Sequence, residues 1–158
     1  MKVIKSNKHT FPKYGHIHTI HSFPSAFAGS RRVDIWLPED YDAQQRHAVL
    51  YMHDGQNLFN PATGFHGQIW AIDAALQPLL YQARVKPTIV VAIWNTSKRY
   101  QEYLPTPAFE LLDEELRQYI QDEHNNPELV PLSDGYLQFI VEELKPYIDE
   151  HYPTRVEA

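Results

Sequence analysis

Two continuous apolar runs constrain the fold of this 158-residue chain more than any other feature. Residues 48–53 and residues 88–94 each lack the polar alternation of a half-buried strand. Strands covered on both faces, as in parallel sheets, carry such runs. Between them, apolar residues at helical spacing predict a helix over about 70–83. The order strand, helix, strand makes a crossover unit, so the sequence predicts an α/β fold.

A β-hairpin is predicted before the first run. Residues 16–21 are rich in β-branched side chains, and residues 32–37 alternate polar and apolar, which predicts a strand with one buried face. After the second run, an acidic helix is predicted over about 109–124, with its apolar residues from Leu111 to Ile120 facing inward. A further helix is predicted from Ser133, as its N-cap, to about Tyr152, and a new strand from residue 154.

Charge is distributed unevenly along the chain. Residues 1–100 hold 11 lysines and arginines against 6 acidic residues, and residues 101–158 hold 3 against 14, giving the net charge of −6. So acidic a segment argues against nucleic acid and anionic membranes as partners. Solvated helix faces explain the acidic segment. Two domains are the alternative, but no Gly/Ser-rich linker separates the halves, and we expect one domain.

Composition also limits the chemistry. Cysteine is absent, which excludes disulfides, thiolate nucleophiles and thiolate metal sites. His16, His18 and His21 have no carboxylate close in sequence, so we expect no metal site there. No cofactor is expected either. No apolar run approaches a membrane span, and the first eight residues lack the apolar stretch of a signal peptide. A cytoplasmic location is the expectation.

The segment from Leu50 to Phe59 is the most informative for function. A buried strand ends at His53, and a polar turn built on Gly55 follows. In open α/β sheets, ligands bind beyond the carboxyl ends of the strands. A glycine there lets backbone N–H groups face a ligand and stabilise a developing oxyanion. An ordinary strand-to-loop turn explains the same residues equally well.

This segment resembles the strand-3 loop of serine esterases in the α/β-hydrolase superfamily, which include the enterochelin-esterase-like and carbohydrate-esterase-like enzymes. Other segments resemble further elements of that family, and together they cover nearly all of residues 16–155. They are residues 30–38 with Tyr41 and Asp42, then 69–73, 86–93, 99–105 and 136–148.

The resemblance implies a partial α/β-hydrolase fold. An N-terminal antiparallel hairpin would lead into a mostly parallel sheet with flanking helices, and the chain would stop before the nucleophile strand. Residues 1–158 would be the N-terminal portion of a single domain. The family places its nucleophile in Gly-x-Ser-x-Gly, and none of the six serines here is flanked in that way. The catalytic Ser, acid and His are therefore expected beyond Ala158, and the chain alone is expected to be inactive.

The resemblance carries supporting residues over to this chain. Gly55 and Gln56 match positions that supply a backbone oxyanion-hole N–H. His53, Asp54 and Asn57 could line the same pocket, with loop hydrogen bonding as the alternative. A further candidate is Arg99, either contacting substrate or pairing with Glu102.

The implied function is the N-terminal part of a carboxylic ester hydrolase acting on a small-molecule ester. The alternative is a degenerate, non-catalytic module that binds a ligand or partner. The scaffold serves many esters, so the substrate stays open. Without a neighbouring strand, the edge of residues 48–53 would be unpaired and apolar, which favours self-association or a complementing chain.

Overall fold

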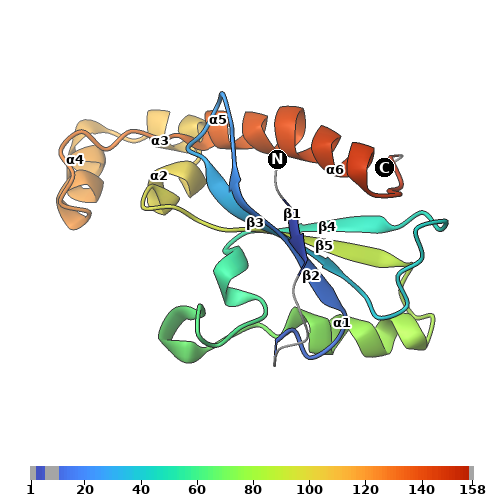
Figure 1. The fold of residues 1–158 in the computed structure, drawn as a ribbon. Helices are drawn as coiled ribbons and strands as arrows, with labels where there is room; N and C mark the ends of the chain where they lie inside the picture. The colour runs from blue at the N-terminus through green and yellow to red at the C-terminus, as the bar shows by residue number, and fades with distance from the viewer. Residues whose placement is uncertain (1–2, 6–10, 157–158) are drawn as a thin grey trace. The chain divides into compact units, whose positions relative to one another are not determined.

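The computed structural model describes residues 3–5 and 11–156. Its strands form one five-stranded sheet in the order β1-β2-β3-β5-β4 (Figure 1). The strands are β1 (Val3–Lys5), β2 (His16–Phe23), β3 (Arg31–Leu37), β4 (Ala48–Met52) and β5 (Thr88–Ile93). The predicted hairpin is confirmed as the antiparallel pair β2 and β3, and both apolar runs are confirmed as strands.

The sheet is mixed. Strands β4 and β5 pair in parallel, and the other three neighbouring pairs are antiparallel. The predicted α/β fold with flanking helices is confirmed, but these residues form a mixed sheet rather than a mostly parallel one. Each parallel pair needs a crossover connection, and the described chain holds one such crossover, through α1 (Ile72–Tyr81). The sequence did not predict β1, which pairs with β2.

The chain divides into two compact units. The first holds the sheet and draws on residues 1–24, 30–95 and 147–158, and the second draws on residues 25–29 and 96–146. The assignment of residues 1–158 to a single domain stays a prediction. Of the helices in the described residues, none combines the length and the apolar character needed to cross a membrane.

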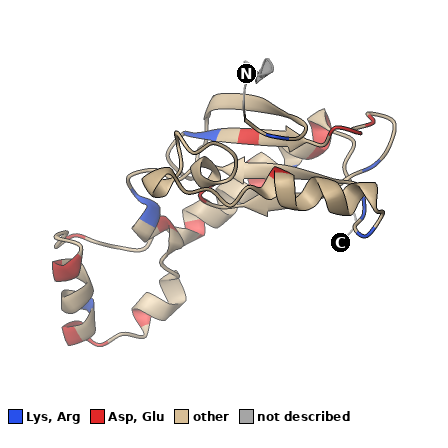
Figure 2. Cartoon of the chain, turned by 90° about the horizontal axis from the view of Figure 1, so that it is seen from below, with Lys and Arg blue, Asp and Glu red and all other residues tan. Residues whose placement is uncertain are grey.

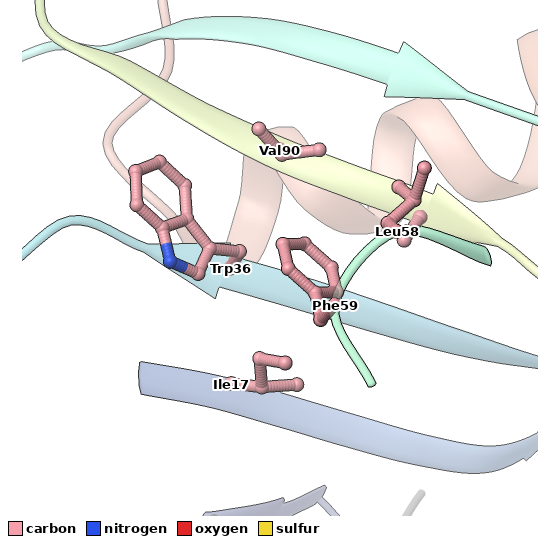
Figure 3. Packing of buried hydrophobic residues seen from close by; sticks show 6 residues of the cluster. Ile17, Trp36, Leu58, Phe59 and Val90 are labelled. Atoms are coloured by element: carbon pink, nitrogen blue, oxygen red, sulfur yellow. The ribbon is translucent and has the colours of Figure 1, made fainter. Parts of the chain in front are cut away.

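One face of the sheet carries a hydrophobic core in the first unit. Ile17 from β2, Trp36 from β3 and Val90 from β5 lie against Leu58 and Phe59 of the loop after β4 (Figure 3). All five side chains are at most 9% exposed. Partly buried apolar residues of α1 pack against the same cluster. The chain after β4 therefore crosses this face, and burial of Leu58 and Phe59 anchors it there.

The second unit is helical. Its helices are α2 (Arg99–Tyr103), α3 (Thr106–Glu110), α4 (Glu114–Glu123) and α5 (Ser133–Gln138), and α5 continues into the π-helix η3 (Phe139–Leu144). The α-helix α6 (Lys145–His151) follows directly, so the helix predicted from Ser133 to about Tyr152 is confirmed over 133–151.

The helix predicted over 109–124 is instead two helices. Asp113 starts α4 as its N-cap, since its carboxylate accepts a hydrogen bond from the Leu116 N–H at 2.9 Å. The predicted inner stripe is wrong for Leu111, Leu116 and Tyr119, which are 88%, 49% and 62% exposed. The described residues of this unit contain no strand, so α4 has no sheet within the unit to pack against. Helical spacing of its apolar residues was therefore not enough to bury them. Figure 2 shows acidic segments on α4, the helix at lower left.

Ser133 is not an N-cap. It is the first residue of α5, one position after the N-cap Leu132, and its hydroxyl oxygen accepts a hydrogen bond from the Thr106 N–H at 3.0 Å. The predicted cap fails because the start of α3 uses this hydroxyl through a tertiary contact.

The strand predicted from residue 154 begins as a single parallel bridge between Thr154 and His47. The His47 N–H donates to the Pro153 carbonyl, and the Arg155 N–H donates to the His47 carbonyl, both at 2.8 Å. Arg155 and Val156 follow without strand structure, and the rest of that prediction, Glu157 and Ala158, lies outside the described residues.

Candidate functional site

The candidate site begins where β4 ends. His53 is exposed, Asp54 and Gly55 are buried, and the single turn η1 (Gly55–Asn57) follows. Asp54 adopts a left-handed backbone conformation, with φ of 53° and ψ of 44°. That conformation turns the chain sharply out of the strand and starts the helical turn at Gly55. Four of the predicted residues, Asp54 to Asn57, therefore share one short loop at the carboxyl end of a parallel strand.

Gly55 is the residue that lets this loop approach β5. A Cβ placed on it would lie 2.7 Å from the carbonyl carbon of Ala92 and 2.9 Å from Cδ1 of Trp94. Both distances are shorter than any normal contact, and the first is to the backbone of a strand with neighbours on both sides. Close backbone approach thus requires glycine at this position.

The backbone N–H groups of the loop fall into two pairs. The later pair closes the turn: the Asn57 N–H donates to the Asp54 carbonyl at 2.8 Å, and the Leu58 N–H donates to the Gly55 carbonyl at 3.3 Å. Within the described part of the chain, no group accepts a hydrogen bond from the Gly55 or Gln56 N–H. The first N–H groups of a helical turn lack an internal partner, which is why the turn itself provides no acceptor for these two.

Side chains of the loop hold its shape. The Asn57 side-chain oxygen accepts from the Phe65 N–H at 3.0 Å, at the start of the turn η2 (Phe65–Gly67). The Gln56 side-chain oxygen accepts from the Asn95 N–H at 3.3 Å, and the Asn95 side-chain amide donates to Asp54 at 2.7 Å. Loop hydrogen bonding, the alternative role for Asp54 and Asn57, is therefore present. Their contact with a ligand stays a prediction, as does that of His53.

A cavity of about 140 Å³ lies beside the loop, between it and the sheet. Gly55 and Gln56 line it together with Asp34, Arg32 and Trp94.

Asp34 is the polar centre of the cavity wall and is only 3% exposed. It accepts hydrogen bonds from the Thr19 hydroxyl at 2.6 Å, Nε of Arg32 at 2.9 Å and Nε1 of Trp94 at 2.8 Å. The Arg32 guanidinium also lies 4.2 Å from the Trp94 ring.

Sequence reasoning missed this network. The alternation of residues 32–37 suggested that the face carrying Asp34 was solvated, whereas the loop after β4 covers it. The one local signal was Trp36, a large apolar residue on the same face of the strand as Asp34.

Arg99 belongs to the second unit. It is the first residue of α2, and its guanidinium lies 4.8 Å from the ring centroid of Tyr103. Its contact with substrate stays a prediction.

Histidine rings do gather in the first unit: those of His16 and His18 are 5.4 Å apart, and Nδ1 of His18 is 2.9 Å from the Tyr152 hydroxyl. Across the described residues, no group of three or more His, Asp or Glu side chains is arranged to hold a metal ion.

Comparison with known proteins places this geometry in context. The family model described as "Putative esterase" matches residues 25–158. A CE1 ferulic acid esterase, AmCE1/Fae1A, from Anaeromyces mucronatus is 21% identical, with a TM-score of 0.55 over 94% of this chain and 47% of that chain. An IroE-like serine hydrolase from Shewanella oneidensis is also 21% identical, with a TM-score of 0.52 over 87% of this chain and 39% of that one.

The BES protein from Bacillus cereus is 16% identical, with a TM-score of 0.54 over 87% of this chain and 49% of that chain. The three solved structures show that the fold is shared. This chain spans less than half of the length of each of them. The comparison with curated proteins found no match.

Proposed function

Since this chain belongs to the esterase family, we propose that it supplies the sheet core and the oxyanion-hole loop of a serine carboxylic ester hydrolase. One observation carries the proposal beyond the family: the neighbouring Gly55 and Gln56 N–H groups have no acceptor within the described residues. They lie at the carboxyl end of a parallel strand, where ligands of open α/β sheets bind.

The reaction would use groups from beyond Ala158. A serine Oγ attacks the ester carbonyl carbon, its proton passes to a histidine, and a carboxylate orients that histidine. The carbonyl oxygen becomes an oxyanion, which accepts a hydrogen bond from the loop at Gly55 and Gln56 and another from the residue after the serine. The histidine proton then goes to the leaving alcohol, and water hydrolyses the acyl-enzyme. His53 and Arg99 are the side chains we propose as pocket lining.

The test compares the chain with its continuation. We expect purified residues 1–158 to hydrolyse neither p-nitrophenyl acetate nor methyl ferulate above the buffer rate. The coding sequence after Ala158 should then contain Gly-x-Ser-x-Gly within about 15 residues, and the longer product should hydrolyse at least one of the esters. A stop codon after Ala158 together with an inactive chain would favour the alternative, a non-catalytic module that binds a ligand or partner.

The β4 edge is proposed as a strand-pairing surface. Among the described residues, β4 pairs along its length with β5 alone. His47, the residue just before β4, forms an isolated parallel bridge with Thr154, so a second strand could pair with β4 in the same direction. Leu50, in the middle of β4, is 39% exposed. We propose that the chain continuing past Thr154 fills this edge, and that copies of residues 1–158 associate through it when that continuation is missing.

A further inference from the structure

One residue outside the loop contacts both sides of it. Asn95 follows β5, and its side-chain amide donates to Oδ1 of Asp54 at 2.7 Å. Its backbone N–H donates to the side-chain oxygen of Gln56 at 3.3 Å. The two bonds therefore join the end of β5 to the residues immediately before and after Gly55.

The backbone conformation of the loop depends on such a contact. Asp54 has a φ of 53°, in the left-handed region, which aspartate adopts where its short polar side chain can form a hydrogen bond. The residue is 8% exposed, so its carboxylate needs a protein donor, and the amide of Asn95 provides a short, charge-assisted one. The same bond thus gives the buried carboxylate a protein donor and favours the left-handed turn at Asp54.

Trp94, the neighbour of Asn95, fixes the other side of the loop. Its indole N–H donates to buried Asp34 at 2.8 Å, which holds the ring where the hydrogen of Gly55 packs closely against it. The end of β5 therefore contacts the loop from Asp54 to Gln56 through two neighbouring residues, Trp94 and Asn95.

We infer that Asn95 is a positioning residue for ester hydrolysis, acting through Asp54 and Gln56 on the two backbone N–H donors. The inference rests on the proposed function of those donors. Asn95 itself touches no reacting atom in this role. Its bonds set the direction of the N–H groups towards the oxyanion, and a misdirected donor lowers the rate of the chemical step rather than substrate binding.

The central variant is Asn95→Asp, which keeps the shape but replaces the donor with an oxygen facing the Asp54 carboxylate. The assay uses the longer product, which includes the continuation past Ala158 and is called here the catalytically complete protein. In it we expect kcat to fall about 10-fold to 100-fold, with KM within about twofold of the parent value. In residues 1–158, hydrogen exchange at the Asn57 and Leu58 N–H groups should accelerate, because their bonds close this turn.

A swap tests the bond itself. Combining Asp54→Asn with Asn95→Asp exchanges donor and acceptor, so slow exchange and most of the lost kcat should return. The matched control is Asn125→Asp, the same substitution at an exposed residue of the second unit with a φ of 46°, and it should change neither readout.

Two results would overturn the inference. One is an unchanged kcat in Asn95→Asp, and the other is a swap that restores neither kcat nor slow exchange. If the parent protein hydrolyses no ester, the proposed function fails. The exchange measurements then decide whether Asn95 holds the loop, and unchanged exchange in Asn95→Asp would refute that as well.

Discussion

Gly55→Ala tests the close approach between the loop and β5. The added Cβ would lie 2.7 Å from the carbonyl carbon of Ala92, whereas ordinary contacts begin at 3.4 Å. Relief of this contact needs a shift of about 0.7 Å, and β5 cannot supply it because β3 and β4 hold it on both sides. The loop must move instead.

The size of the effect follows from that displacement. Forcing an extra methyl group into a packed site costs about 1–3 kcal/mol of unfolding free energy. For a chain of this size each kcal/mol lowers Tm by about 2–4 °C, so Gly55→Ala should melt roughly 2–12 °C below the parent. In the catalytically complete protein, the displaced N–H groups should also lower kcat by about 10-fold or more.

Thermal melting followed by circular dichroism, together with urea unfolding, measures the loss. Gly29→Ala is the matched control, because no atom lies within 4 Å of a Cβ added there. It should leave stability unchanged or raise it by up to about 1 kcal/mol through the unfolded chain. If Gly55→Ala melts together with the parent and with Gly29→Ala, the close packing of the loop against β5 is refuted.

Three further outcomes follow from other contacts. Asp34→Asn should lower the urea-unfolding free energy by about 2–3 kcal/mol, because a buried acceptor of three hydrogen bonds becomes partly a donor. The hydroxyl of Tyr81 donates to Glu39, and this bond raises the pKa of Tyr81 to about 12, so its stabilisation is present below pH 10 and is lost as pH rises through 12. Tyr81→Phe should accordingly flatten the fall in stability over that range. Leu50→Lys should reduce concentration-dependent association of residues 1–158, measured by analytical ultracentrifugation.

Each outcome has a clear opposite. Asp34→Asn as stable as the parent would mean that its three bonds contribute nothing net. An unchanged stability curve in alkaline solution for Tyr81→Phe would remove Tyr81 from the pH dependence. Association that persists equally in Leu50→Lys would place the contact between copies away from the β4 edge.

The elements around the candidate site differ in how well the sequence predicted them. Strands β4 and β5 carry their own signal, since a run of apolar residues must be covered wherever it lies. Gly55 was also predictable, as the turn that ends a buried strand. The hydrogen bonds that hold that turn were not predictable, because Asn95 is 41 residues from Asp54, and Trp94 is 60 residues from Asp34.

The helices make the same point. Leu111 and Tyr119 have the spacing of a buried stripe, yet both are exposed, and the helix predicted over 109–124 is broken at Asp113. Asp34 differs in the opposite direction. It is a charged residue on an alternating strand, which suggests exposure, yet a loop distant in sequence buries it.

The sequence by itself determined the α/β class, the hairpin, the parallel pair and the resemblance to serine esterases, all of which depend on local periodicity and motif order. The tertiary structure alone decided that Asp34 is buried and that the Ser133 hydroxyl accepts a hydrogen bond from α3 rather than capping its own helix. It also decided that Asn95 hydrogen-bonds to the residues on either side of Gly55. The reason is physical: periodicity states which side of an element can be apolar, but burial and hydrogen bonding depend on which distant segment covers that side.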